Sequence, residues 1–172
     1  MDPIIEPLGK SHDRAALSCG TEQLDRYIRQ QAAQDERNHV AAVFVLASPG
    51  STSIIGYYTL SAFTVLLRDI PENQRKHLPR YPQVRAVLLE RLAVDARNTG
   101  QGWGKVLLID ALRRSLAHSQ QIAAMAVVVD AIDESAQRFY AKFGFLPLLD
   151  PDDEHERRLF LEMKTIEQLL QP

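Results

Sequence analysis

The sequence has little cysteine and no long apolar run, and both absences limit what the protein can be. A single cysteine, Cys19, among 172 residues excludes a disulfide framework and fits a reducing compartment. No apolar run approaches the roughly 20 residues that a membrane-spanning helix needs. The first residues, Met1-Asp2-Pro3, lack the basic and apolar regions of a signal peptide. We therefore expect a cytoplasmic protein without a membrane anchor.

Surplus positive charge and clusters of metal-ligand residues are also lacking. The net charge is −2 and the pI is near 6.2, so bulk charge does not indicate a nucleic-acid-binding protein. Any contact with RNA has to come from a local patch. No group of Cys and His has the spacing of a metal site, and we expect no metal. The length is that of one ordinary domain, and we expect residues 1–172 to form a single domain.

Hydrophobic patterning predicts a mixed α/β fold. Strands are expected over residues 4–8, 40–47, 54–63, 84–94, 123–129, 145–148 and 157–163. Helices are expected over residues 21–34, 103–118, 133–143 and 165–170. We interpret 48–51 as a hairpin turn and the proline-containing segment 68–82 as irregular. This order predicts a mixed sheet with helices on both faces, in which the strands 84–94 and 123–129 are parallel.

What the sequence does contain is a glycine-rich turn between a strand and a helix, Thr99-Gly100-Gln101-Gly102-Trp103-Gly104-Lys105. Glycines allow the backbone to approach a bound group closely. The first amides of the following helix lack intrahelical partners and carry the positive end of the helix dipole, which favours an anion, most often a phosphate. We therefore interpret this turn as the binding site of a phosphorylated cofactor. A purely structural turn is the alternative.

Two common phosphate-binding motifs do not fit this turn. A dinucleotide-binding fold places the turn near the start of the chain and an acidic residue about 20 residues later, whereas Asp130 is further away. A P-loop requires Ser or Thr after Gly-Lys, but Val106 follows Gly104-Lys105. Ligands of such sheets bind beyond the carboxyl ends of the strands, which places Val94 beside the turn.

Three segments together resemble the GCN5-related N-acetyltransferase (GNAT) superfamily. They are the strand Leu92-Ala93-Val94 with its glycine turn, the strand end Val128-Val129-Asp130-Ala131, and the helix Ala136-Gln137-Arg138-Phe139-Tyr140-Ala141-Lys142-Phe143-Gly144. Four segments resemble the acetyltransferase toxins of type II toxin–antitoxin systems. They are Cys19-Gly20-Thr21-Glu22-Gln23-Leu24-Asp25-Arg26-Tyr27-Ile28, Gly56-Tyr57-Tyr58-Thr59-Leu60-Ser61, Glu90-Arg91-Leu92-Ala93-Val94-Asp95 and Val129-Asp130-Ala131. The resemblance covers nearly the whole chain, from residue 5 to residue 166.

The resemblance implies a fold, a reaction and partners. The implied GNAT fold is a mixed, mostly antiparallel sheet with splayed parallel central strands and helices on both faces. The implied reaction transfers acetyl from acetyl-coenzyme A (acetyl-CoA) to the α-amine of an aminoacyl-tRNA, which blocks translation. The implied partners are a second copy of the chain and a ribbon–helix–helix antitoxin, through which operator DNA is bound. The alternatives are acetylation of a small amine or a protein N-terminus, and a non-catalytic binding module such as a repressor subunit.

The resemblance also implies roles for individual residues. Tyr140 is the expected general acid for the departing thiolate, and the backbone amide of Val94 is the expected oxyanion contact. The α-amine of an aminoacyl ester has a lower pKa than a lysine side chain (about 10.4), so a strong general base is dispensable. The residues expected to contact acetyl-CoA are Leu92, Ala93, Val94, Thr99, Gly100, Gln101, Gly102, Trp103, Gly104, Lys105, Asp133 and Phe143.

Several of these residues have a structural interpretation as well. Tyr140 also fits a core aromatic residue, and Asp133 a helix N-cap. We interpret Cys19 as a small buried residue rather than a nucleophile, because no local histidine accompanies it. The superfamily turn reads Arg/Gln-x-x-Gly-x-Gly/Ala. If the helix starts at Trp103, Thr99 stands where the pattern has Arg or Gln, and the sequence departs from the pattern. In the alternative register, Arg97 stands at that position and the pattern fits.

Basic residues are concentrated between residues 68 and 97, where they are interleaved with Tyr81. Arginine and lysine here can bind tRNA phosphates, and the residues expected to do so are Arg75, Lys76, Arg80, Arg85 and Arg91. A solvated surface loop is the alternative, and for Arg91 a structural ion pair. The acidic residues of 150–156 would repel RNA, and we expect them to face away from it or to meet a basic antitoxin segment. These are Asp150, Asp152, Asp153, Glu154 and Glu156.

Overall fold

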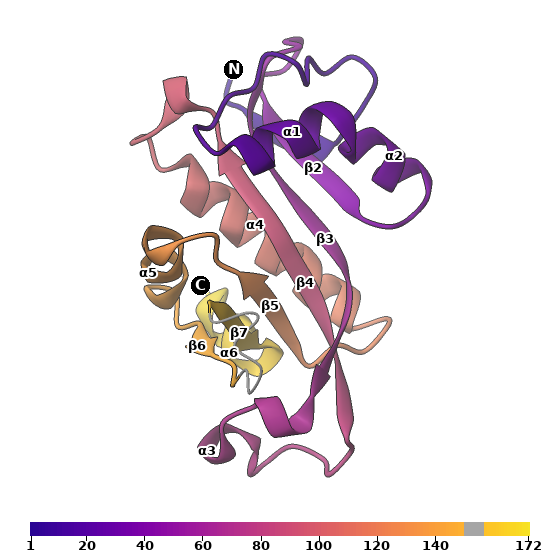
Figure 1. Ribbon diagram of the computed structural model, residues 1–172, viewed down its shortest axis with the longest axis vertical. Helices are drawn as coiled ribbons and strands as arrows, with labels where there is room; N and C mark the ends of the chain where they lie inside the picture. The colour runs from indigo at the N-terminus through magenta and orange to yellow at the C-terminus, as the bar shows by residue number, and fades with distance from the viewer. Residues whose placement is uncertain (150–156) are drawn as a thin grey trace. The chain divides into compact units, whose positions relative to one another are not determined.

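The computed structural model describes residues 1–149 and 157–172, and its described strands form one sheet in the order β1-β2-β3-β4-β5-β7-β6 (Figure 1). The strands are β1 (Ile4–Pro7), β2 (Ala42–Ala47), β3 (Ile54–Leu66), β4 (Gln83–Val94), β5 (Ala126–Asp130), β6 (Leu146–Pro147) and β7 (Arg158–Glu162). The α-helices are α1 (Glu22–Gln30), α2 (Ala32–Arg37), α3 (Glu72–Arg75), α4 (Trp103–Ser119), α5 (Glu134–Ala141) and α6 (Met163–Leu169). Two short 3₁₀ helices are η1 (Leu67–Asp69) and η2 (Ala96–Asn98).

The strand pairing is mixed, as the sequence predicts. β4 and β5 pair in parallel, with Ala86 opposite Ala126 and Leu89 opposite Val129. The pairs β1–β2, β2–β3, β5–β7 and β6–β7 are antiparallel. α4 connects the two parallel strands and begins at Trp103. The predicted mixed α/β fold is therefore confirmed, together with its parallel pair.

The chain forms two compact units, each built from two separate stretches of sequence. The first unit contains Met1–Ser61 and Glu90–Ala111, and the second contains Ala62–Leu89 and Leu112–Pro172. β3, β4 and α4 contribute residues to both units. That residues 1–172 act as a single domain stays a prediction.

The core of the first unit joins α1 to the hairpin of β2 and β3. The rings of Tyr27 and Tyr57 stack with centroids 6.3 Å apart, and the Tyr57 hydroxyl donates a 2.7 Å hydrogen bond to the carbonyl of Leu24. Ile28 and Val43 are fully buried in the same cluster. The apolar spacing of α1 is therefore explained by packing on the sheet.

The predicted helix over residues 21–34 is wrong in its extent. Gln31, with φ −120° and ψ −34°, separates α1 from α2. Thr21 holds the N-cap position of α1 but makes no side-chain capping hydrogen bond. The break allows Ala32 to be fully buried in the core, so tertiary packing overrides the helical periodicity of the sequence.

The core of the second unit surrounds β5. Ala126, Val127, Val128 and Val129 are fully buried, because β4 and β7 flank this strand. Phe160 of β7 belongs to the same apolar cluster. Burial of the strand explains why its sequence contains almost no polar residue.

Other element boundaries also differ from the predictions. β2 begins at Ala42 rather than at residue 40, after His39 with a positive φ of 56°. β3 continues to Leu66, and β5 begins at Ala126. The segment 68–82, predicted to be irregular, contains part of η1 and the short helix α3.

The acidic segment of residues 150–156 lies outside the described residues, so the expectation about Asp150, Asp152, Asp153, Glu154 and Glu156 is untested. Within the described ranges, none of the helices has the length and apolar character required to cross a lipid bilayer.

Gly56 on β3 lies against backbone and side-chain atoms of its own unit. A Cβ at this position would lie 2.7 Å from the carbonyl oxygen of Ala93 and 2.8 Å from Cδ1 of Leu107. We predict that Gly56→Ala lowers the free energy of unfolding by about 1–3 kcal/mol, because the neighbouring backbone has to shift. Chemical denaturation measures this change.

Gly9→Ala is the matched control. A Cβ at Gly9 would have Nδ1 of His12 as its nearest neighbour at 3.6 Å, an ordinary contact. Its effect on stability should stay within about 0.5 kcal/mol. Equal losses in the two variants would contradict the prediction.

Candidate active site

The glycine turn after β4 adopts backbone conformations that favour glycine. Gly100 has φ +77° and Gly102 has φ +83°, and an added Cβ at either residue would meet no atom within 4 Å. The turn is therefore open beside both glycines and gives a ligand direct access to the backbone. Gly104 differs from these two, because it lies in the first turn of α4.

The start of α4 presents unpaired amides to this open turn. The N–H of Val106 donates to the carbonyl of Gly102 at 3.3 Å, so the amides of Trp103, Gly104 and Lys105 precede the regular helical hydrogen bonds. The helix dipole adds positive potential at the same place. A turn of this kind fits a phosphate group.

Asp95, the residue after β4, is a buried carboxylate that fixes the entry to the turn. Its oxygens accept hydrogen bonds from the backbone N–H groups of Ser18 (3.1 Å) and Arg97 (2.9 Å). The Arg97 guanidinium pairs with both oxygens, at 2.8 Å and 3.0 Å. The guanidinium hydrogen bonds, followed by those from the two backbone groups, lower the pKa of Asp95 to about 2 against the opposing effect of burial.

The structure distinguishes the two registers of the turn. α4 begins at Trp103, the helix start for which Thr99 takes the first position of the superfamily pattern. The hydroxyl of Thr99 donates to the carbonyl of Ala96 at 3.0 Å. Arg97, in the other register, has its guanidinium paired with Asp95. The first position of the turn therefore offers no Arg or Gln side chain to a phosphate, and phosphate binding by the backbone amides stays a prediction.

The end of β4 leads directly into the turn. Ala93 is buried in the core, whereas Leu92 and Val94 are partly exposed. The N–H of Asp95 donates to the carbonyl of Ile55 at 2.8 Å, which ties the strand end to β3. Within the turn, Gln101 accepts a 3.2 Å hydrogen bond from the indole N–H of Trp103. The contacts of Leu92, Ala93 and Val94 with acetyl-CoA stay predictions, as do those of Gln101 and Lys105.

Tyr140 lies on α5, in the second unit, and is almost completely buried. Phe139 and Phe145 pack edge-on against its ring, with centroids 5.2 Å and 5.5 Å away. Burial raises the pKa of the Tyr140 phenol above its ordinary value, so the hydroxyl keeps its proton at neutral pH. The core packing expected of an aromatic residue is present, and a protonated phenol is what a general acid requires.

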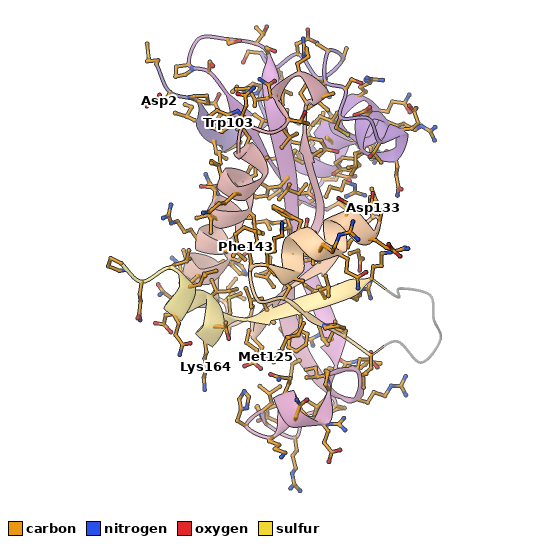
Figure 2. All side chains as sticks on the ribbon, turned by 90° about the vertical axis from the view of Figure 1, so that its left-hand side faces the viewer. Asp2, Trp103, Met125, Asp133, Phe143 and Lys164 are labelled. Atoms are coloured by element: carbon orange, nitrogen blue, oxygen red, sulfur yellow. The ribbon has the colours of Figure 1, made fainter. Side chains whose placement is uncertain are left out.

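Asp133 and Phe143 lie at opposite ends of α5 (Figure 2). Asp133 is the N-cap, and its carboxylate accepts a 2.8 Å hydrogen bond from the N–H of Ala136. Phe143 packs against Phe139 with ring centroids 5.3 Å apart. Both residues therefore have structural roles, and their contacts with acetyl-CoA stay predictions.

Cys19 has the surroundings of a structural residue. Its N–H donates to the carboxylate of Asp25 at 2.8 Å. Burial, together with Asp25, raises the pKa of the Cys19 thiol to about 11. A thiol that stays protonated is a poor nucleophile, which supports the interpretation made from the sequence. No cluster of three or more His, Cys, Asp or Glu residues in the described part of the chain is arranged to hold a metal ion.

The arginines and lysine between residues 68 and 91 divide into two groups. Arg85 donates to the hydroxyl of Thr64 at 2.6 Å, and Arg91 pairs with Glu90 at 2.8 Å. The Arg91 guanidinium also lies 3.6 Å from the ring centroid of Tyr27. Arg91 therefore has the structural ion pair considered from the sequence. The second group lines a groove beside α3, and its residues are Arg68, Arg75, Lys76 and Arg80.

Sequence reasoning gave no role to Asp95 or to Tyr27 beside Arg91. An Asp directly after a strand, with an Arg two residues later, was an available signal for Asp95. The contact between Tyr27 and Arg91 joins distant parts of the chain, and no local sequence pattern indicates it.

Gly102 allows a direct test of the turn. We predict that Gly102→Ala raises the KM for acetyl-CoA about tenfold, because a side chain at φ +83° costs roughly 1–2 kcal/mol and enters the open turn. Steady-state kinetics with varied acetyl-CoA measures this change.

Gly50→Ala is the control for the backbone cost alone. Gly50 has a similar φ of +77° and equally open surroundings, but it lies in the turn between β2 and β3. The control should lose a similar amount of stability and keep the KM of the unmodified protein. A KM that rises equally in both variants would argue against a ligand site at Gly102.

The sequence matches the family described as "Acetyltransferase (GNAT) domain" over residues 82–167. This range contains β4, the glycine turn, α4, β5 and α5. The chain belongs to the GNAT acetyltransferase family, and the predicted resemblance is confirmed. It is thus an acetyl-CoA-dependent N-acetyltransferase.

Within this family, two relatives with similar sequences are named as toxins. The chain is 30% identical over 175 residues to a protein of Sinorhizobium fredii (strain NBRC 101917 / NGR234) named probable toxin TacT, covering 97% of this chain and 94% of the relative. It is 32% identical over 138 residues to a tRNA-acetylating toxin of Mycobacterium tuberculosis (strain ATCC 25618 / H37Rv), covering 80% of this chain and 81% of the relative.

Solved structures of similar toxins cover nearly the whole chain. AtaT complexed with acetyl-methionyl-tRNAfMet has a TM-score of 0.90 at 29% identity, covering 99% of this chain and 100% of the other. AtaTR bound with acetyl-CoA has a TM-score of 0.85 at 29% identity, covering 99% of each chain. A mutant AtaT toxin bound to the C-terminus of the antitoxin AtaR has a TM-score of 0.83 at 28% identity, covering all of both chains.

Proposed function

We propose that the protein is a toxin that acetylates the α-amine of an aminoacyl-tRNA and so blocks translation. The observation that carries this proposal is the open glycine turn at the start of α4, in a chain that resembles tRNA-acetylating toxins over most of its length. The turn fits the pyrophosphate of acetyl-CoA, because its amides are unpaired and no side chain fills the space beside Gly100 and Gly102. Acetyl-CoA supplies the acetyl group as a thioester.

The residues of the chain then have defined tasks. The amides of Trp103, Gly104 and Lys105 hold the pyrophosphate, and Asp95 keeps the turn in place. The backbone amide of Val94 donates to the oxygen that becomes negative when the amine nitrogen bonds to the acyl carbon. Tyr140 gives its phenolic proton to the sulfur as the carbon–sulfur bond breaks, and solvent returns a proton to the phenolate. The proton of the attacking amine passes to solvent.

The remaining site residues take supporting positions in this proposal. Leu92 and Ala93 contribute backbone next to Val94, and Thr99, Gly100, Gln101 and Gly102 form the wall of the turn. Phe143 contacts the pantetheine arm, and Asp133 sets the start of α5.

The proposed biology follows from the reaction. The protein acts in the cytoplasm, where charged tRNA is found. It forms a homodimer, and a ribbon–helix–helix antitoxin neutralises it and brings the complex to operator DNA. Sedimentation of the pure protein tests the dimer, with a monomer as the contrary result.

Transfer of labelled acetyl groups tests the function itself. The pure protein is incubated with radiolabelled acetyl-CoA and total charged tRNA, and we expect label on the RNA that mild base releases, because the ester to the amino acid is labile. The control is the same tRNA with its amino acids removed beforehand, which should take up no label.

One result of this experiment would contradict the proposed function. If the RNA stays unlabelled while calorimetry shows acetyl-CoA binding, the acceptor is a small amine or a protein N-terminus. Sequencing of the labelled tRNA, in the expected case, identifies the target.

A further inference from the structure

A strap of residues 17–19 lies between β1 and α1 and bonds to the segment that enters the glycine turn. Its first peptide group, from Leu17 to Ser18, is held at both ends. The carbonyl of Leu17 accepts a 2.7 Å hydrogen bond from the guanidinium of Arg29 on α1, and the N–H of Ser18 donates to the Asp95 carboxylate at 3.1 Å. Because a peptide group is planar and stiff, this one connects α1 firmly to the entry of the turn.

The second peptide group of the strap, from Ser18 to Cys19, has the same arrangement in the opposite sense. The carbonyl of Ser18 accepts a 2.8 Å hydrogen bond from the N–H of Ala96, at the entry of the turn. The N–H of Cys19 donates to the carboxylate of Asp25 on α1 at 2.8 Å, and Asp25 is buried. Two successive peptide groups therefore bridge α1 and the turn entry.

The hydrogen bonds continue from the strap into the turn itself. Ala96, whose N–H donates to Ser18, accepts through its carbonyl a 3.0 Å hydrogen bond from the Thr99 hydroxyl. Thr99 directly precedes Gly100, the first of the two open glycines. All of these residues belong to the first unit, so one compact body contains an unbroken path from α1 to the turn.

The guanidinium of Arg29 has a different task from that of Arg26, its neighbour on α1. Arg26 is exposed and lies 3.5 Å from the carboxylate of Glu22, an ordinary surface pair within one helix. Arg29 instead donates to a neutral backbone carbonyl outside the helix. A role in surface charge does not require this contact, whereas holding the strap does.

The position of the strap matters for an anion at the turn. Backbone amides bind a phosphate well only when they already point to one place, because ordering them during binding lowers the affinity. The strap fixes Asp95 and Ala96, and these residues fix the approach to the amides at the start of α4.

We propose that Arg29 is a positioning residue for acetyl-CoA, which acts through the strap to hold the glycine turn in its phosphate-binding geometry. This inference rests on the pyrophosphate site of the proposed function and adds α1 as a determinant of cofactor affinity. Because coupling between two sites is reciprocal, a bound cofactor also tightens the strap.

The test compares Arg29→Met with Arg26→Met. Methionine keeps an apolar stem and a high helix propensity but cannot donate to the carbonyl of Leu17. We expect the Kd of Arg29→Met for CoA, measured by calorimetry without any acceptor, to rise about three- to tenfold, since part of the cost of one lost hydrogen bond reaches the turn. Arg26→Met is the matched control and should keep the Kd of the unmodified protein. Thermal unfolding establishes that both variants are folded.

A conservative variant tests the hydrogen bond itself. The ammonium of Arg29→Lys still has protons to donate to the carbonyl of Leu17, so its Kd for CoA should stay within about twofold of that of the unmodified protein.

Hydrogen exchange of the ligand-free protein tests the path without the cofactor. In Arg29→Met we expect the amides of Ser18 and Ala96 to exchange about tenfold faster, while the amides of the hairpin β2–β3 keep their rates. In the unmodified protein, added CoA should slow the exchange of the Ser18 amide.

Two results would overturn the inference. One is an equal Kd for CoA in Arg29→Met and the unmodified protein, even with faster exchange in the strap. The other is an equal rise in Kd for Arg29→Met and Arg26→Met, which would assign the effect to the charge of α1. If Arg29→Met alone binds CoA weakly but no label reaches tRNA, the proposed acceptor fails and the role of the strap stands.

Discussion

We expect Tyr140→Phe to lower kcat by about 10²- to 10⁴-fold, the usual contribution of a general acid, and to leave the affinity for acetyl-CoA unchanged. The reason is that Phe keeps the ring that packs against Phe139 and Phe145 and removes only the hydroxyl. Single-turnover acetylation of charged tRNA, combined with calorimetry of acetyl-CoA binding, measures the two effects separately.

The pH dependence of kcat is a second test of the role of Tyr140. Burial raises the pKa of Tyr140 above its ordinary value of about 10. The phenol therefore keeps its proton below pH 10, and we expect no fall in kcat from its deprotonation in that range. A fall in kcat that begins near pH 8 and is absent from Tyr140→Phe would argue against this assignment.

Tyr57→Phe is the control for the loss of a buried hydroxyl. This residue is fully buried, and its hydroxyl donates to the carbonyl of Leu24. We expect a loss of about 1 kcal/mol of stability and no change in kcat. Equal kcat values for Tyr140→Phe and the unmodified protein would rule out catalysis by Tyr140.

Asp95→Ala is the substitution with the largest expected effect on stability. It leaves the N–H groups of Ser18 and Arg97 without their acceptor, and we expect a loss of about 3 kcal/mol. The KM for acetyl-CoA should rise as well, because Asp95 fixes the entry to the glycine turn. Denaturant unfolding and steady-state kinetics measure the two changes.

The contribution of Asp95 depends on pH in a defined direction. Its pKa is about 2 in the folded protein, below the ordinary value of 3.8, so the ionised carboxylate stabilises the fold. This stabilisation is complete above pH 4 and is lost as the pH falls towards 2. The stability difference between the protein and Asp95→Asn should therefore narrow over this range.

Asp13→Asn is the matched control. Asp13 is exposed and accepts hydrogen bonds from the N–H groups of Ala15 and Ala16. Its replacement should change stability by no more than about 0.5 kcal/mol. If the difference in unfolding free energy between Asp95→Asn and the unmodified protein stays constant down to pH 2, the role given to Asp95 is contradicted.

Elements with a strong local signal were predictable from the sequence. The glycine turn, the start of α4 at Trp103 and the N-cap Asp133 follow from residue types that favour one local conformation. The parallel pair β4–β5 follows from the helix between two apolar strands. The first three signals each lie within a few neighbouring residues, whereas the parallel pair follows from the order of the elements along the chain.

Elements that depend on distant contacts were not predictable. The helix breaks at Gln31, and Ala32 after it is fully buried. The spacing of apolar residues in the sequence does not predict this break. α3 is only four residues long, too short for a hydrophobic period, and Pro71 precedes it at the N-cap position. The contact of the Arg91 guanidinium with the Tyr27 ring depends on how α1 packs. The glycine turn was thus predictable as a candidate site, but the division of the basic residues into structural and available groups was not.

The pairing of β5 has a consequence for biosynthesis. This strand pairs with β4, made earlier, and with β7, made near the end of the chain, in the register Val128 opposite Phe160. A nascent chain that has not yet reached Glu162 leaves one edge of β5 open, and the unit that contains Tyr140 is incomplete. We therefore expect a chain that terminates before β7 to lack a complete second unit, so that the proposed toxicity requires synthesis of β7.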